Sequence, residues 1–224
     1  MEIVTTDKQG NLATRALSRA EMLAPRTSEK QAVEISRIMT PKQFAVEFIW
    51  REYQNAVFAK FGTVENESAV RAKIDKIVEW LQFTKSRPWL RISGYIGNGK
   101  STMLGAIKSW YEKTHPRMLY TLVTAQQVIK VAQSENKDAF DKLINFPRLM
   151  IDDLGTEPNE ILVFGNKMQP IRELLYHRYD RRLQTVFTTN LTDKDFSDYY
   201  GERIADRCRE LQAKIVFTEK SYRK

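Results

Sequence analysis

The chain has 224 residues, 42% of them hydrophobic, which is enough for one full domain with an appendage and a buried core. No apolar run is long enough to span a membrane, and the start MEIVTTDKQG is unlike a secretory signal. The single cysteine, Cys208, cannot form an internal disulfide. We therefore expect a cytoplasmic protein with no membrane partner. The formal net charge of +8 favours an anionic partner, with nucleic acid as the first candidate and a merely basic surface as the alternative.

The N-terminal part of the chain divides into a polar segment and a helix. Residues 1–38 are mixed in charge with little periodicity, and we predict that they are flexible or weakly helical. A helix over about 40–61 is predicted because Thr40 can cap it, Pro41 fits its first turn and Gly62 ends it. Its aromatic-rich face leaves two interpretations open: packing on its own domain, or docking onto a partner protein.

A phosphate-binding loop is the strongest motif. GYIGNGKS, which ends at Ser101, fits the pattern G-x-x-x-x-G-K-[S/T] at every fixed position, between a predicted strand over 89–94 and a predicted helix over 101–113. Its glycines let backbone N–H groups surround a polyphosphate, Lys100 adds positive charge at the β- and γ-phosphates, and the Ser101 hydroxyl can ligate Mg²⁺. The residues expected to hold the nucleotide here are Gly94, Tyr95, Ile96, Gly97, Asn98, Gly99, Lys100, Ser101 and Thr102.

Strands and helices alternate around and after this loop. Further helices are predicted over 70–83, 125–133, 137–146, 170–182 and 195–211, and further strands over 118–124, 148–155, 185–190 and 214–223. Such alternation implies a parallel sheet with helices on both faces, which is an α/β fold.

Two adjacent acids, Asp152 and Asp153, lie at the end of the apolar run Leu149–Ile151. A carboxylate there can hold Mg²⁺ beside the Ser101 hydroxyl, a role that we assign to Asp152, and Asp153 is then placed to orient or deprotonate the attacking water. Asn190 ends the next strand, from which a polar side chain can reach between these acids and the γ-phosphate. A turn or capping role is the alternative in each case.

Two further motifs concern the nucleotide. Arg203 and Arg207 share a helix face, and an arginine offered to a neighbouring subunit's γ-phosphate can stabilise the transition state, with a solvated basic face as the alternative. The stretch Asn166–Gln169 looks like the guanine-reading NKxD motif. Because Gln169 replaces its aspartate, we favour ATP over GTP.

From about Val70 to Arg223 the chain resembles the AAA+ ATPases of the DnaC/DnaI helicase-loader and IstB transposition-helper group. The matching pieces, in order, are GYIGNGKS, LMIDDLGTE, HRYD, TTN, YGERIADR and the terminal SYR. The resemblance implies a P-loop NTPase (AAA+) fold with a central parallel sheet flanked by helices, plus a short helical N-terminal extension. We accordingly expect a partner-docking extension over 1–66 and an AAA+ ATPase domain over 67–224.

The resemblance also implies roles by position. Lys100 and Ser101 match the Walker A pair, Asp152 and Asp153 match the Walker B acids, and Asn190 matches sensor 1. The implied catalytic residues are Asp153, Lys100, Asn190 and Arg207. Mg²⁺ would be held by Ser101 and Asp152.

The resemblance also implies roles for three more parts of the chain. Arg207 matches the arginine finger, and Arg223 matches a late arginine near the nucleotide. The segment Ala125–Phe146 matches a helical element that lines a single-stranded DNA channel. Lys130, Lys137 and Lys142 are its candidate phosphate contacts, with a solvated helix face as an equal alternative for each.

The function that the resemblance implies is helicase loading. The chain would bind ATP and Mg²⁺, self-associate in the ATP state, bind single-stranded DNA and deliver a hexameric replicative helicase onto it. Its ATPase would be weak alone and stimulated by assembly or DNA. The alternatives are an IstB-like transposition ATPase that assembles on duplex DNA with a transposase, and a nucleotide-gated adaptor with little hydrolysis.

Overall fold

The computed structural model describes residues 2–6, 12–16, 39–62, 64, 66–134, 136–163 and 165–222. In these ranges the strands are β1 (Glu2–Thr6), β2 (Leu12–Ala16), β3 (Trp89–Gly94), β4 (Thr121–Thr124), β5 (Arg148–Leu154), β6 (Ile161–Val163), β7 (Asn166–Met168), β8 (Gln184–Thr189) and β9 (Gln212–Phe217). The helices are α3 (Pro41–Phe61), α4 (Glu67–Gln82), α5 (Lys100–Thr114), α6 (Ala125–Ala132), α7 (Lys137–Ile144), α8 (Pro170–Asp180), α9 (Asp193–Tyr200) and α10 (Glu202–Leu211).

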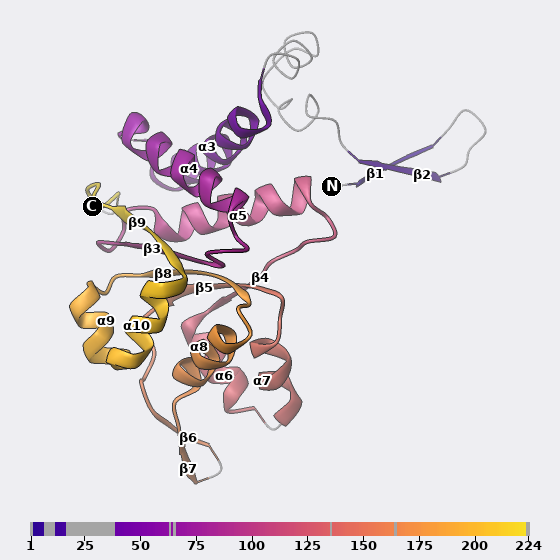
Figure 1. The fold of residues 1–224 in the computed structure, drawn as a ribbon. Coiled ribbons are helices and arrows are strands. Elements are labelled where there is room, and N and C mark those ends of the chain that lie inside the picture. Colours follow the sequence, from indigo (N-terminus) through magenta and orange to yellow (C-terminus); the bar gives the residue numbers. More distant parts are fainter. Residues whose placement is uncertain are drawn as a thin grey trace.

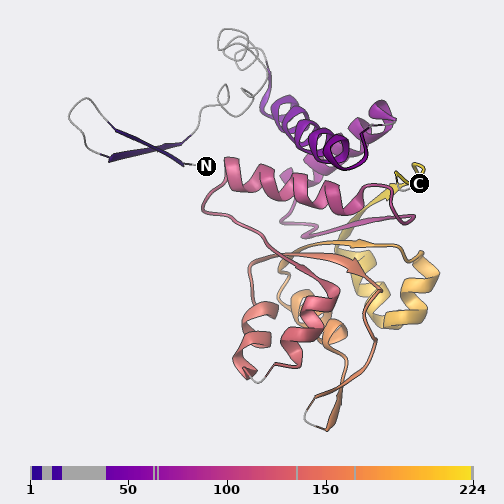
Figure 2. The same ribbon diagram turned by 180° about the vertical axis from the view of Figure 1, so that it is seen from behind.

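Five of these strands form one parallel sheet in the order β4-β5-β8-β3-β9, with α3, α4 and α5 on one face and α6 to α10 on the other (Figures 1 and 2). Because the strands run in the same direction, their C-terminal ends meet at one edge, here called the carboxyl edge, and their N-terminal ends meet at the opposite amino edge. This architecture confirms the predicted α/β fold class.

Each face of the sheet has its own hydrophobic core, because successive side chains of a strand point to opposite faces. Leu90 and Ile92 of β3 pack into the core beneath α3, α4 and α5, and Trp89 packs into the core beneath α6 to α10. Among the described helices, none combines the length and apolar character that crossing a membrane requires.

The helix α3 begins and ends where the sequence predicts. The Thr40 hydroxyl accepts a hydrogen bond from the Gln43 backbone N–H at 3.2 Å, and the Gln43 side chain accepts one from the Thr40 N–H at 2.9 Å, which completes a capping box. Gly62 ends the helix with a φ of 74°, a left-handed conformation that glycine adopts at low cost.

The aromatic face of α3 packs inside the domain. Phe44 and Phe48 contact the Trp110 ring of α5 edge-on, with ring centroids 5.7 and 5.5 Å apart, and both belong to the core that includes Ile92 of β3. Of the two interpretations of this helix, packing on its own domain therefore describes its buried face. The core continues across the boundary predicted at residues 66 and 67.

Other parts of the fold differ from the sequence predictions. Gly201, at a φ of 90°, divides the helix predicted over 195–211 into α9 and α10. The antiparallel pair β1–β2 lies in the segment predicted to be flexible or weakly helical, and the hairpin β6–β7 lies where no element was predicted. These four strands have three or five residues each, which carry too little hydrophobic periodicity to be recognised from the sequence.

Candidate nucleotide-binding site

The loop between β3 and α5 has the strand–loop–helix context that the motif requires. Gly99 precedes α5 with a φ of 94°, and an added Cβ would lie 2.2 Å from the hydroxyl oxygen of Tyr53 on α3. At Gly94 an added Cβ would lie 2.1 Å from the Phe217 carbonyl oxygen of β9. The glycines therefore serve close backbone packing as well as backbone conformation, and α3 and β9 support the loop.

Lys100 is the first residue of α5, and its ammonium group lies inside the loop. It donates to the carbonyl oxygens of Gly94 at 2.9 Å and Tyr95 at 2.6 Å and to the Asn98 side-chain oxygen at 3.1 Å. Asn98 in turn donates to the Phe217 carbonyl at 2.7 Å. Asn98 thus braces the loop against β9, a role that the motif does not predict.

Ser101 and the two acids come together at the carboxyl edge, as the sequence predicts. The Ser101 hydroxyl donates to an Asp152 carboxylate oxygen at 3.0 Å. Thr188 of β8 donates to the same oxygen at 2.5 Å and accepts from the Asp153 backbone N–H at 2.8 Å. Thr188 was missed by the sequence reasoning, although it stands in the TTN stretch that drew attention to Asn190.

Asp153 has a backbone φ of 58°, which is unusual for a residue with a side chain. The register between β5 and β8 shifts between Ile151 and Leu154, so the two acids occupy an irregularity at the end of the strand. Such strained positions persist where surrounding contacts fix them, and they cluster at functional sites.

A pocket of about 260 Å³ lies beside these groups. It is lined by Lys60, Phe61, Ile96, Gly97, Gly99, Lys100, Ser101, Thr102, Asp153, Thr156 and Asn190. The structure thus brings Asn190 and Thr102 to the predicted site, and the side-chain oxygen of Asn190 is buried without a hydrogen-bond partner. Lys60 and Phe61 come from the end of α3, a contribution that no phosphate-loop motif reveals.

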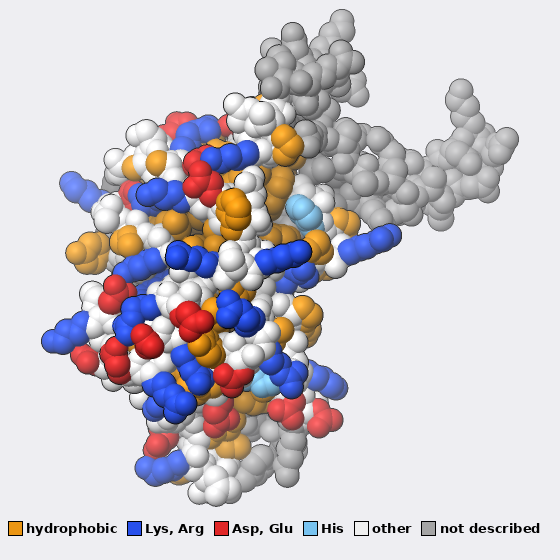
Figure 3. Space-filling model, viewed as in Figure 1, with side chains coloured by type: hydrophobic (Ala, Val, Ile, Leu, Met, Phe, Trp, Pro, Cys, Tyr) orange, Lys and Arg blue, Asp and Glu red, His pale blue; other side chains and the backbone are white. Residues whose placement is uncertain are grey.

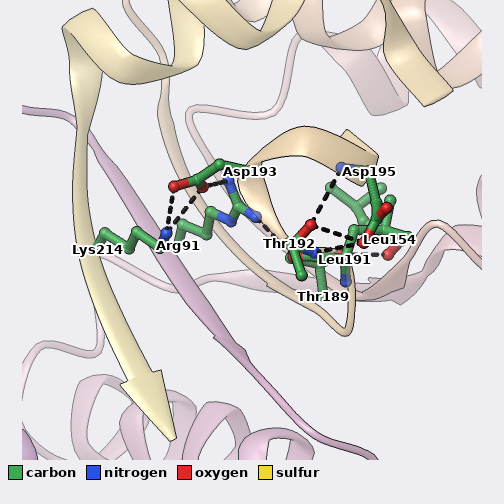
Figure 4. Close-up of polar contacts among 8 residues, drawn as sticks. All are labelled: Arg91, Leu154, Thr189, Leu191, Thr192, Asp193, Asp195 and Lys214. Carbon is green, nitrogen blue, oxygen red and sulfur yellow. Dashed lines mark hydrogen bonds and ion pairs between the residues drawn. The ribbon is translucent and has the colours of Figure 1, made fainter. Parts of the chain in front are cut away.

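A buried arginine fixes the segment that follows Asn190. Arg91 of β3 donates to the Leu191 carbonyl at 2.7 Å and pairs with the Asp193 carboxylate at 2.9 Å (Figure 4). Lys214 of β9 contacts the same carboxylate at 2.7 Å. Burial lowers the pKa of Arg91, and Asp193 partly opposes that shift.

The same segment is also joined to the end of β5. The Thr189 hydroxyl donates to the Leu154 carbonyl at 2.7 Å and accepts from the Leu191 N–H at 3.1 Å (Figure 4). Asn190 therefore lies between Thr189, whose hydroxyl links β8 to the strand that carries both acids, and Leu191, which Arg91 of β3 holds. The arrangement presents its side chain at a fixed place beside Asp153.

The loop after the acids is anchored by a buried carboxyl group. Glu157 accepts from the Gly155 N–H at 2.9 Å and from the Tyr200 hydroxyl of α9, and its own carbonyl accepts from the Tyr199 hydroxyl. Burial raises the pKa of Glu157, and the Tyr200 hydrogen bond partly opposes that shift.

The remaining predicted residues lie outside the pocket or outside the described ranges. Arg207 rests on the rings of Tyr176 and Tyr179 at 4.7 and 4.5 Å and pairs with Asp180 at 3.4 Å, and it does not line this pocket. Arg223 and the Lys137 side chain are outside the part of the chain that the structure describes. Lys130 and Lys142 are exposed on α6 and α7.

The similarity of this chain to known proteins is structural. No protein-family model and no curated protein sequence matches it. The crystal structure of the DnaC helicase loader matches with a TM-score of 0.57 and 17% identity, over 76% of this chain and 98% of that one. DnaI matches with a TM-score of 0.55 and 21% identity, over 78% and 92% of the two chains.

A third structure, described as a putative primosome component from Streptococcus pyogenes serotype M3, matches with a TM-score of 0.55 and 24% identity, over 72% of this chain and 85% of that one. This chain has the fold of DnaC and DnaI. That is the fold that the resemblance in the motifs led us to expect.

Proposed function

We propose that the chain is an ATPase of the AAA+ type that binds ATP together with Mg²⁺. The observation that carries the proposal is the 3.0 Å contact between the Ser101 hydroxyl and the Asp152 carboxylate. Ser101 directly follows Lys100 at the start of α5. Lys100 and Ser101 from the start of α5 meet Asp152 from the end of β5 there, and each group has the chemistry that a nucleoside triphosphate requires.

The oxygen donors of Ser101 and Asp152 fit Mg²⁺, which prefers hard oxygen ligands from few protein groups alongside substrate phosphates. When bound, the ion would neutralise charge on the phosphates. Lys100 would exchange loop carbonyl acceptors for phosphate oxygens, and the N-terminus of α5 would direct backbone N–H groups at them. Asp153 would orient or deprotonate the attacking water, with Asn190 beside it.

Arg207 would act on a neighbouring subunit. Its guanidinium rests on two tyrosine rings rather than in its own pocket, which supports a role in trans. ATP-dependent self-association would bring it to the γ-phosphate of the next subunit, so hydrolysis would be weak in the isolated chain and stimulated by assembly or DNA.

The biological role that we propose is delivery of a hexameric replicative helicase onto single-stranded DNA. The fold shared with the DnaC helicase loader and the basic charge of the chain support it. A transposition ATPase on duplex DNA and a partner-gating adaptor are distinguished from it by the following measurement.

Fluorescence anisotropy would compare single-stranded and duplex oligonucleotides, with ADP and with a non-hydrolysable ATP analogue, for the wild type and Lys100→Ala. The proposal expects a preference for single strands that needs the ATP analogue and that is lost in the variant. Cooperative binding to duplex DNA would favour the transposition ATPase instead, and no binding to either would leave the adaptor.

A further inference from the structure

The loops that lead into the sheet at its amino edge are rich in positive charge. They precede β4, β5, β8 and β3, and their basic residues are Lys85, Arg87, Arg117, Arg148, Arg181 and Arg182. The described segments 83–88, 115–120, 145–148 and 181–184 contain no aspartate or glutamate. Five of the six side chains are exposed, and Arg148 is half-buried.

Contacts between these loops show that they form one continuous surface. Arg182 donates to the Ser86 carbonyl at 3.3 Å, which joins the loop before β8 to the loop before β3. Arg178, buried on α8, donates to the carbonyls of Phe146 and Gln184, each at 2.7 Å, which joins the loop before β5 to the start of β8.

The loop before β4 completes the row. Thr121, the first residue of β4, pairs with Leu149 of β5, so the loop before β4 ends beside the start of β5, where Arg148 lies. Since neighbouring strands lie about 4.8 Å apart, the row from β4 to β3 is roughly 14 Å long.

Exposed apolar side chains are interleaved with the charges. Phe83 is 64% exposed, Leu119 54%, and Phe146 and Met118 40% each, all in the same loops. Phe83 ends α4 in a tight turn whose carbonyl accepts from the N–H groups of Ser86 and Arg87, so its ring is held at the surface beside the cations. Blue and orange side chains lie side by side on the right flank of Figure 3, the flank down which the α5–β4 connection runs in Figure 1.

We infer that this amino-edge surface binds single-stranded nucleic acid, with its cations along the phosphates and Phe83 and Phe146 stacking on bases. Arginine outnumbers lysine here, and arginine both forks onto phosphate and stacks on bases. Positive charge combined with exposed aromatic rings is the pattern of single-strand binding, because duplex bases are already stacked. An acidic protein is the other occupant that the cations would accept, and the binding test separates the two.

The inference deepens the proposed function, on which it rests, because it states where the DNA lies. It assigns the DNA to the loops at the edge opposite the phosphate loop rather than to the exposed Lys130 and Lys142 of α6 and α7. The assignment to the amino edge and the assignment to α6 and α7 therefore make opposite predictions for the same binding assay.

The test is the affinity of the full chain for a dye-labelled oligothymidylate, measured by anisotropy as a function of salt. Arg117→Ala combined with Arg181→Ala removes two amino-edge cations, and Lys76→Ala combined with Lys194→Ala removes the same charge from exposed positions on α4 and α9. We expect the amino-edge variant to bind roughly tenfold more weakly. Its slope of log affinity against log salt should be shallower by about 1.4, because each lost phosphate contact is worth about 0.7 for single strands. The control should change little.

Phe83→Ala gives a second measurement that does not change the charge. We expect roughly tenfold weaker binding with an unchanged salt slope, since stacking carries no counterion release. A fluorescent ATP analogue should bind all variants equally, which verifies that they are folded.

Three results would overturn the inference. If the wild type binds the oligonucleotide and Lys130→Ala with Lys142→Ala weakens it while the amino-edge variants do not, the site is wrong and the proposed function stands. If acidic polyglutamate is preferred over the oligonucleotide and needs the same arginines, the partner is an acidic protein. If the wild type binds ATP but no DNA, the DNA-binding part of the proposed function fails as well.

Discussion

The carboxyl and amino edges of the sheet have opposite chemistry. Acids gather at the carboxyl edge, where Asp152 and Asp153 lie at the end of β5, Glu157 follows it and Asp193 follows β8. At the amino edge the loops before β4, β5, β8 and β3 carry only basic charge, and Arg182 pairs with Glu210 of α10 at 3.7 Å. A site that handles a magnesium–phosphate complex needs carboxylates, whereas a surface that follows bare phosphates is weakened by them. One parallel sheet thus separates the proposed nucleotide site from the proposed DNA surface, which would interfere with each other if they were adjacent.

The comparison predicts that loss of a reacting group at the carboxyl edge alters ATP turnover, whereas substitutions at the amino edge alter stability or DNA affinity and leave turnover unchanged. The largest expected effect is that of Asp153→Asn. Asparagine tolerates the positive φ of this position, so the backbone is retained while the carboxylate is lost. ATP turnover should fall by about 10²- to 10⁴-fold with ATP affinity nearly unchanged. Turnover equal to the wild type would remove Asp153 from the chemistry.

Arg178→Lys tests the amino edge. Arg178 is fully buried, burial lowers its pKa to about 9, and its guanidinium donates to Thr185 and to three carbonyls. Lysine cannot reproduce that planar set of donors, so urea unfolding should show a loss of about 3 kcal/mol. ATP turnover per folded molecule should stay at the wild-type value. A fall in turnover without loss of stability would contradict the separation of the two edges.

Gly99→Ala tests how the phosphate loop rests on α3. The added Cβ would meet the Tyr53 hydroxyl at a φ of 94°, so we expect a loss of about 2 kcal/mol in the free energy of unfolding, together with weaker ATP binding. The matched variant is Gly99→Ala combined with Tyr53→Phe, which removes the obstructing oxygen and should recover part of the loss. Gly105→Ala, on the open face of α5, is the control and should not destabilise the protein.

The smallest effect is a pH dependence at Glu157. Because its pKa is raised in the folded protein above the ordinary 4.5, the folded state holds its proton more tightly than the unfolded state. Its contribution to stability is therefore full below pH 4.5 and is lost as the pH rises through the raised pKa. Glu157→Gln should remove this pH dependence. In the wild type the dependence changes the free energy of unfolding by about 1 kcal/mol for each unit by which the pKa is raised. Parallel curves of unfolding free energy against pH for the two proteins would show that burial does not perturb the group.

The carboxyl edge could be predicted from the sequence because its chemistry is local. The spacing from Gly94 to Ser101 and the acids after an apolar run each fit within a few residues, and parallel strands necessarily bring their ends together. Asn190 could be predicted in the same way, because it directly follows the parallel strand β8. The contribution of Thr188 was missed because a threonine inside a strand has the same local pattern whether it bonds a carboxylate or packs in a core.

The support of the site could not be predicted, because it comes from tertiary contacts. Nothing near Gly99 indicates Tyr53, which is remote in the chain, and the aromatic pattern of α3 fits a core helix and a docking helix equally well. The amino edge was missed for a related reason. Its cations are scattered over four loops, and only the sheet assembles them.

The contact between Tyr53 and Gly99 has a thermodynamic consequence for the segment that the sequence sets apart as an appendage. The helix α3 supplies Tyr53 to the phosphate loop and Lys60 and Phe61 to the pocket, and on its outer side it presents Phe58, which is 58% exposed. A partner that binds through Phe58 and shifts α3 would change the affinity for ATP. By reciprocity, ATP would change the affinity for that partner by the same factor.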